Sequence, residues 1–189
     1  MSVTEIIKLV ATYLQMEDVL ELTTFGGEVT EPSALTTKNL ELLVRCLNLV
    51  YDEIATDYIP LNYEEEVIVL DEEIALSSLA KRLINVIKLT DENGVNVKYK
   101  MFPTAIVLEN GTYNLEYSYA PESATLDGNI ETFGGKLTER IVAYGVTAEY
   151  SLISGLFDEA TTWEQRFKDA LLVASRKKSD IKMPVRRWL

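Results

Sequence analysis

The spacing of apolar residues changes twice along this chain, and this change constrains the fold more than any other feature. In residues 38–58 the apolar side chains recur at intervals of three and four, which predicts an amphipathic helix. They are Leu40, Leu43, Leu47, Val50, Ile54 and Tyr58. From Glu64 to about residue 120 the interval becomes two, as in strands, and helical spacing returns from Leu137. Helices before and after a group of strands predict an α+β fold.

The N-terminal segment also has apolar residues near helical spacing. We expect one helix around residues 3–15 and a short second helix near residues 17–22. A loop rich in Gly, Thr and Pro follows them. Thr36 or Thr37 is then expected to cap the helix of residues 38–58, which Pro60 ends.

Alternating segments between Glu64 and residue 120 predict an antiparallel β-meander of about four to five strands. Asn93-Gly94 and Asn110-Gly111 are predicted hairpin turns, since Asn-Gly pairs accept positive φ. The last alternating segment places three tyrosines and a leucine on one face: Tyr113, Leu115, Tyr117 and Tyr119. Packing in a half-buried sheet explains this row better than a base-stacking platform, because the strand offers Glu116 where nucleic acid requires Lys or Arg.

Two helices are predicted after the sheet. Residues 137–157 carry charges only at Glu139, Arg140 and Glu149, so this helix is expected to be buried. The second helix places its apolar side chains on one face: Trp163, Phe167, Leu171 and Ala174. Thr161 and Glu164 fit a capping box at its start. We therefore expect one α+β domain over residues 1–175, with the sheet inserted at about residues 64–120, and an extended basic tail over residues 176–189.

Charge is divided unequally along the chain. Residues 1–160 hold 10 Lys and Arg against 27 Asp and Glu, a net charge of −17. Residues 161–189 hold 8 against 3, and this excess of +5 lies entirely from Arg176 onward. So acidic a body is a poor general binder of nucleic acid. The basic tail fits either an acidic partner surface or a solvated chain end, and charge alone does not decide between them.

Several classes of function are disfavoured by composition. Histidine, the commonest general base and transition-metal ligand, is absent, and the chain has no Gly-rich phosphate loop, GxSxG elbow or CxxC pair. The single cysteine, Cys46, lies in an apolar helical segment and is expected to be a buried thiol. We therefore predict no catalytic, metal or cofactor site and a role other than that of an enzyme. The chain also lacks an apolar run long enough for a membrane span and a recognisable secretion signal, so we expect synthesis in the cytoplasm and no membrane partner.

Four segments and their order resemble phage head–tail connector proteins, the adaptor rings between portal and tail. The segments are RCLNLVYDEIATDYIP (residues 45–60), YGVTAEYSLISGLF (144–157), EATTWEQRFKD (159–169) and the terminal RRWL. The resemblance implies a virion structural protein at the head–tail junction. It also implies a homo-oligomeric ring, expected to be a dodecamer, that binds the portal and further neck or tail proteins. DNA would pass through its channel without specific binding.

In this family the C-terminal segment commonly grips the portal. For this chain, the resemblance implies that the tail, residues 176–189, is a portal-docking segment. Arginine forks pair with carboxylates, and an indole with a leucine supplies an apolar anchor. The predicted docking residues are Arg176, Lys177, Lys178, Lys182, Met183, Pro184, Val185, Arg186, Arg187, Trp188 and Leu189.

Two alternatives belong to other classes. An acidic DNA mimic or inhibitor that occupies a nucleic-acid-processing partner is motivated by the charge of −17 over residues 1–160, but it requires carboxylates arrayed on one face. A hydrolase that uses carboxylates alone would require convergent acids with raised pKa values in one pocket, and we rank it last.

Overall fold

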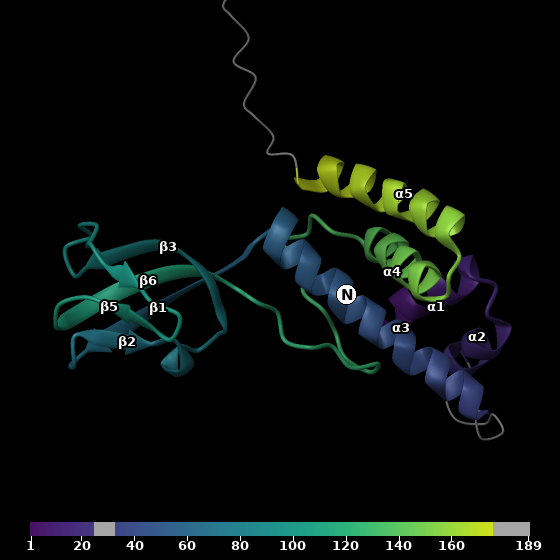
Figure 1. Ribbon diagram of the computed structural model, residues 1–189, viewed down its shortest axis with the longest axis horizontal. Coiled ribbons are helices and arrows are strands. Elements are labelled where there is room, and N and C mark those ends of the chain that lie inside the picture. The colour runs from purple at the N-terminus through teal and green to yellow at the C-terminus, as the bar shows by residue number, and fades with distance from the viewer. Residues whose placement is uncertain (25–32, 176–189) are drawn as a thin grey trace, which may run out of the picture.

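The computed structural model describes residues 1–24 and 33–175, which form a helical part and a sheet part that projects from one end of it (Figure 1). The helical part contains α1 (Val3–Tyr13), α2 (Glu17–Thr24), α3 (Ala34–Glu53), α4 (Glu139–Ile153) and α5 (Phe157–Ser175). The strands lie between α3 and α4 in the sequence. The predicted α+β class, with helices before and after an antiparallel sheet region, is confirmed.

Helix α3 begins earlier than its apolar spacing predicts. Its N-cap is Ser33, whose hydroxyl accepts a hydrogen bond from the Thr36 amide at 3.1 Å. The expectation that Thr36 or Thr37 caps the helix is therefore wrong, and the Thr36 hydroxyl instead donates to Asp18 of α2. At its other end α3 passes into a π-helical turn, η1 (Ile54–Tyr58), and leaves helical geometry before Pro60, as expected.

Helix α4 lies at the centre of the helical part and packs against α1, α3 and α5. Its Gly145 lies close to both α3 and α5. A Cβ atom added there would lie 2.7 Å from Val50 Cγ1 and 2.9 Å from Phe167 Cε2. The surrounding apolar side chains are fully or almost fully buried: Ile6, Ile7, Val10, Leu43, Leu47, Val142, Val146 and Leu171. The three helices can therefore pack this closely because glycine has no Cβ atom.

The break between α4 and α5 lies at Gly155, which has a φ of 78°. Glycine accepts this conformation at low cost, and it commonly ends helices. Helix α4 is therefore shorter than the predicted segment 137–157, and α5 begins at Phe157. The capping box predicted at Thr161 and Glu164 is wrong, because Thr161 lies inside α5 and its hydroxyl donates to the Phe157 carbonyl at 2.9 Å.

The strands form two antiparallel sheets of three, where a single meander of four to five strands was expected. One sheet has the order β1 (Leu61–Val69), β6 (Gly111–Tyr119), β3 (Leu83–Asp91). The other has the order β2 (Glu73–Ala75), β5 (Ala105–Val107), β4 (Lys100–Met101). A short 3₁₀ turn, η2 (Leu76–Ser78), follows β2.

The two Asn-Gly pairs differ in outcome, since only Asn93-Gly94 lies in a turn between antiparallel segments that pair with each other. Asn110-Gly111 joins β5 to β6, which belong to different sheets, so that hairpin is wrong. Asn93-Gly94 does lie in a turn, where the Asp91 carboxylate accepts the amides of Asn93 and Val95 at 2.9 and 2.8 Å. The chain after it pairs antiparallel with β3 through a short bridge between Thr90 and Asn96, where the Val97 amide donates to the Leu89 carbonyl at 3.0 Å. The long antiparallel partner of both β1 and β3 is β6 instead.

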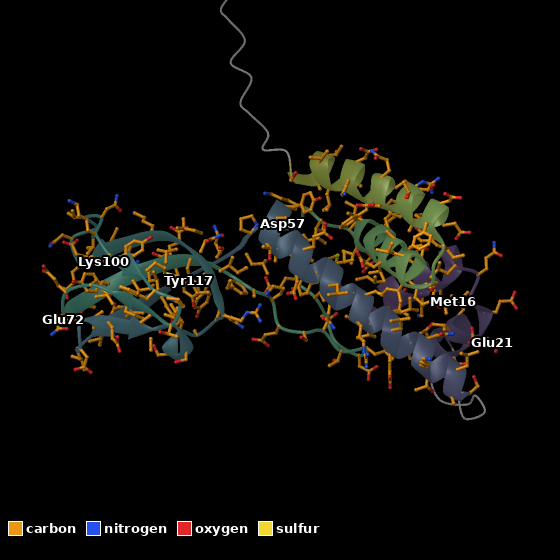
Figure 2. All side chains as sticks on the ribbon, in the orientation of Figure 1. Met16, Glu21, Asp57, Glu72, Lys100 and Tyr117 are labelled. Carbon is orange, nitrogen blue, oxygen red and sulfur yellow. The ribbon has the colours of Figure 1, made fainter. Side chains whose placement is uncertain are left out.

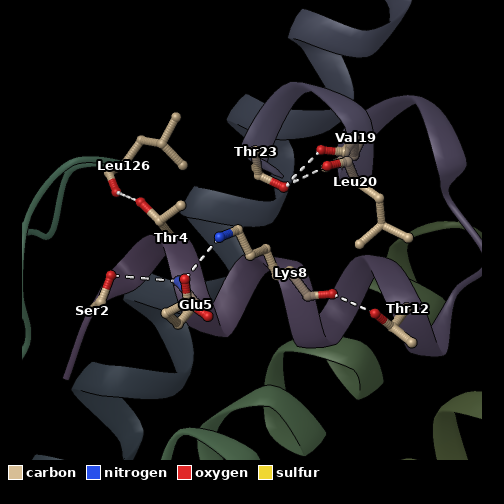
Figure 3. Close-up of polar contacts among 9 residues, drawn as sticks. All are labelled: Ser2, Thr4, Glu5, Lys8, Thr12, Val19, Leu20, Thr23 and Leu126. Carbon is tan, nitrogen blue, oxygen red and sulfur yellow. Dashed lines mark hydrogen bonds and ion pairs between the residues drawn. The ribbon is translucent and has the colours of Figure 1, made fainter. Parts of the chain in front are cut away.

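The segment of residues 120–138 leads from β6 back along the helical part. The Asn48 side chain of α3 holds it with two hydrogen bonds, accepting the Ala124 amide at 2.7 Å and donating to the Ala124 carbonyl at 3.1 Å. The Thr4 hydroxyl of α1 donates to the Leu126 carbonyl at 2.9 Å, beside the Ser2 N-cap (Figure 3). These contacts hold the segment that follows β6, which has no regular structure, against α3 and α1.

Candidate interaction surfaces

The predicted docking tail lies outside the described residues. This applies to Arg176, Lys177, Lys178, Lys182, Met183, Pro184, Val185, Arg186, Arg187, Trp188 and Leu189. What the structure describes is the helix that leads to them, α5, which ends at Ser175. Ala160, Phe167 and Leu171 bury one face of α5 against the other helices. The segment before the tail is therefore well anchored.

Three aromatic rings gather where α1, α4 and α5 meet. Tyr13 of α1 stacks on Trp163 of α5 with ring centroids 4.9 Å apart, and Tyr144 of α4 lies 5.8 Å from Tyr13 and 5.6 Å from Trp163. Two arginines flank this cluster. The Arg166 guanidinium lies 4.9 Å from the Trp163 ring centre, and that of Arg140 lies 5.5 Å from the Tyr144 ring, whose hydroxyl its Nε contacts.

We call these five residues, Tyr13, Arg140, Tyr144, Trp163 and Arg166, the arginine flank. Both guanidinium groups are exposed, whereas the rings are half-buried. Sequence reasoning missed this cluster. The spacing of Trp163 and Arg166, and of Arg140 and Tyr144, hints at two local pairs, but Tyr13 lies more than 120 residues away and joins them only in the folded chain.

Carboxylates gather on the opposite side of α5. Glu53 and Asp57, at the end of α3 and in η1, lie near Glu149 of α4 and Glu164 of α5. Lys168 pairs with Glu164 in this group. Burial raises the pKa of the Glu53 carboxyl, and the negative charge of Glu149 raises it further, while Lys168 acts in the other direction. We call these residues, Glu53, Asp57, Glu149, Glu164 and Lys168, the acidic flank.

Asp57 lies where the helical part meets the sheet part (Figure 2). The ring of Tyr58, the next residue, packs against that of Phe167 of α5, with the ring centroids 6.5 Å apart. The acidic flank thus begins at the junction of the two parts and follows α5 away from it. Asp57 and Glu164 are exposed, while Glu53 and Glu149 are half-buried.

An exposed apolar turn lies at the end of the helical part remote from the sheet part (Figure 1). It connects α4 to α5 and consists of Leu152, Ile153, Leu156 and Phe157, which are 45–66% exposed. Four large apolar side chains within six consecutive residues form a contiguous patch, unlike isolated exposed apolar residues. Such patches mark contact surfaces.

The tyrosine row of β6 is a packing surface, as predicted, because Tyr113, Leu115, Tyr117 and Tyr119 are all buried. The Tyr117 hydroxyl donates to Glu65 Oε1 at 2.6 Å and accepts the Lys81 amide at 3.1 Å. Burial, and then the hydrogen bond to Glu65, raise the pKa of Tyr117 to about 12. The phenol therefore stays protonated and supports the sheet structurally.

The acidic run Glu64–Glu66 of β1 is divided between the two faces of the sheet. Glu65 points to the buried face of β1 and also accepts the Ala80 amide at 3.2 Å. Glu64 and Glu66 are exposed on the outer face of the β1–β6–β3 sheet, where Glu116 of β6 lies directly opposite Glu64. Lys88 of β3 is the cross-strand neighbour of Glu116 on its other side.

Within residues 1–24 and 33–175, no group of three or more His, Cys, Asp or Glu side chains is placed to hold a metal ion. Nor does a helix of these two ranges combine the length and apolarity needed to cross a membrane. Cys46 is fully buried, as predicted, and burial together with the negative charge of Glu149 raises the pKa of its thiol to about 11. A thiol protonated to this degree is a poor nucleophile at neutral pH.

Comparison with known proteins adds no family assignment. No protein-family model matches this chain, and no curated protein sequence matches it significantly.

Proposed function

We propose that this chain is a non-enzymatic structural subunit of the neck of a tailed phage or prophage virion. In this role it forms a ring that joins the portal to the tail and extends the DNA channel. The observation that carries the proposal is the division of charge. Residues 1–175 hold 12 Lys and Arg against 29 Asp and Glu, whereas residues 176–189 hold 6 against 1. The resemblance of four segments to connector proteins supports the same role.

The anchoring of α5 supports a docking role for the tail. Leu171 and Phe167 are 0% and 3% exposed, so the helix that leads to the tail is fixed to the body. In the tail itself, Arg186 and Arg187 supply forks for carboxylates and Trp188 supplies an apolar anchor. In a ring, many tails engage one portal together, so each contact can be modest.

The acidic body fits a channel through which DNA moves. Carboxylates facing the channel repel the phosphate backbone, and DNA then slides without a specific binding site. In this proposal the ring lies at the head–tail junction, with twelve subunits expected and further neck or tail proteins bound on the side away from the portal.

Removal of the tail tests the docking claim. Deleting residues 183–189 is expected to abolish co-sedimentation with the candidate portal ring, while circular dichroism and the melting temperature stay unchanged. The substitution Arg186→Ala/Arg187→Ala is expected to weaken binding in the same assay. A matched control, Lys98→Ala/Lys100→Ala, removes two positive charges from the sheet part and should retain binding. Undiminished attachment of the deleted protein would refute portal docking by the tail.

A second candidate is an acidic inhibitor that mimics DNA. The observation in its favour is the outer face of the β1–β6–β3 sheet, where Glu64, Glu66 and Glu116 lie together. Glu64 and Glu66 are two residues apart on one strand, a separation of about 6.8 Å. Lys88 beside Glu116 offsets part of this charge. Affinity capture separates the candidates, because a mimic recovers a nuclease or polymerase through this face, whereas an adaptor recovers portal protein through its tail.

A further inference from the structure

The arginine flank and the acidic flank lie on opposite sides of the same helix. Successive residues of an α-helix are rotated by about 100°. Relative to the buried Phe167, Arg166 is therefore turned about 100° one way and Lys168 about 100° the other. The aromatic contacts agree, since Trp163 meets Tyr13 of α1 on one side and Phe167 meets Tyr58 of η1 on the other.

The arginine flank has cationic groups available for a partner. Among the described residues, the ion pairs within 4.0 Å are Lys8–Glu5, Lys81–Glu122 and Lys168–Glu164. Arg140 and Arg166 take part in none of these. Each guanidinium instead lies over an aromatic ring, which restricts the side chain and leaves its outward N–H groups for a carboxylate. Little conformational entropy then remains to be lost on binding.

The acidic flank has the complementary excess. It contains four carboxylates, from Glu53, Asp57, Glu149 and Glu164, and one ammonium group, from Lys168. The half-buried position of Glu53 makes its ionised form costly, which is why a further cation placed there would be favourable. The guanidinium groups of the arginine flank are therefore complementary in charge to the excess carboxylates of the acidic flank.

We propose that subunits associate head to tail, with the arginine flank of one copy against the acidic flank of the next. Contact between two different surfaces, one on each side of α5, is heterologous, the kind that closes into a ring when its rotation permits. A symmetric contact would instead bring two like-charged surfaces together, which costs free energy in a body this acidic. This interface rests on the ring of the proposed function and identifies the residues that hold its subunits together.

Charge reversal of each flank tests the pairing. The first variant, Arg140→Glu/Arg166→Glu, has acidic side chains on both flanks. The second, Asp57→Arg/Glu164→Arg, has basic side chains added to the acidic flank. Each alone is expected to lose self-association in analytical ultracentrifugation. An equimolar mixture is expected to assemble, because reversed flanks then meet their complements in an alternating ring. Native mass spectrometry should find the two variants at a ratio of one to one.

Matched controls make the same change of net charge on the sheet part. Lys98→Glu/Lys100→Glu and Glu92→Arg/Glu109→Arg alter exposed side chains away from both flanks, and Lys100 lies at the far end of the sheet part (Figure 2). Both controls should associate as the unaltered protein does. Melting temperatures of all four variants check that each is folded.

The proposal is overturned if either flank variant assembles alone as well as the unaltered protein does. It is equally overturned if the mixture is no more associated than its separate components. Portal binding through the tail is measured in parallel on the same proteins. If the mixture assembles but does not bind portal, the interface is supported and the adaptor role is refuted. If it binds portal but does not assemble, only the interface is refuted.

Discussion

The indole ring of Trp163 stacks on the phenol ring of Tyr13, with the ring planes 24° apart. Tyr13 is the last residue of α1 and Trp163 lies in the second turn of α5, so this contact joins α1 to α5. Tyr144 of α4 completes the cluster. The contact therefore holds the first turns of α5 against α1 and α4.

Truncation of Trp163 should loosen α5. Burying aromatic side chains contributes strongly to stability, and full truncation in a core costs about 3–5 kcal/mol. Because Trp163 is only half-buried, we expect Trp163→Ala to lower the free energy of unfolding by about 2 kcal/mol. Urea unfolding followed by circular dichroism measures this loss. The exposed neighbour Thr162 provides the control, since Thr162→Ala should change stability far less.

Substitution of Gly145 should destabilise the junction of α3, α4 and α5. Alanine favours helices over glycine by about 1 kcal/mol, but overpacking a core costs about 1–3 kcal/mol. The added Cβ would clash with Val50 Cγ1 and with the Phe167 ring. We therefore expect Gly145→Ala to lower the free energy of unfolding. Adding Val50→Ala removes one clashing atom. Thermal unfolding should then show the double variant losing less than the sum of the two single losses, and simple additivity would speak against the steric explanation.

Asn48 should control the segment that leads back from the sheet. Asn48→Ala removes both hydrogen bonds to Ala124, and a buried hydrogen bond contributes about 0.5–1.5 kcal/mol. We expect a loss of about 1–3 kcal/mol and faster hydrogen exchange at the Ala124 amide. Asn48→Asp keeps the oxygen that accepts this amide but not the donor to the carbonyl, so its effect should be smaller. Unchanged exchange in Asn48→Ala would contradict this role.

The stability of the acidic flank should depend on pH through Glu53. The pKa of its carboxyl is raised in the folded chain above the ordinary 4.5, so the folded state holds the proton more tightly than the unfolded state does. Stability is then lost as pH rises from 4.5 through the folded pKa, and it stays lower above that value. Glu53→Gln should therefore raise the melting temperature at neutral pH.

The gain from Glu53→Gln is expected to vanish below about pH 4, where glutamate is protonated in both the folded and the unfolded state. The exposed Glu66 serves as the control, since Glu66→Gln should give no comparable gain at neutral pH. Differential scanning calorimetry across this range measures both variants. A gain for Glu53→Gln that is the same at every pH would point to packing rather than ionisation.

Local features of the chain could be predicted because their cause is local. The helical spacing of Leu40, Leu43 and Leu47, and the alternation of Tyr113, Leu115 and Tyr117, each reflect one face of one element meeting a core. The buried thiol of Cys46 follows from the same pattern. The sequence predicts helix starts less accurately. Thr36 and Thr37 fit a cap as well as Ser33 does in sequence, and α5 begins at Phe157, before the expected cap at Thr161.

The sequence by itself thus determined the fold class, the buried faces and the division of charge between body and tail. Only the tertiary structure decided which strands pair, since β6 joins β1 from about 50 residues away in preference to its chain neighbour β5. Backbone hydrogen bonds are alike in every pairing, so the choice depends on burial of side chains that are distant in sequence. The same holds for the composition of the two flanks of α5. Helix geometry alone separates Arg166 from Glu164. Only the tertiary structure brings Tyr13 to the side of Arg166 and Glu53 to the side of Glu164.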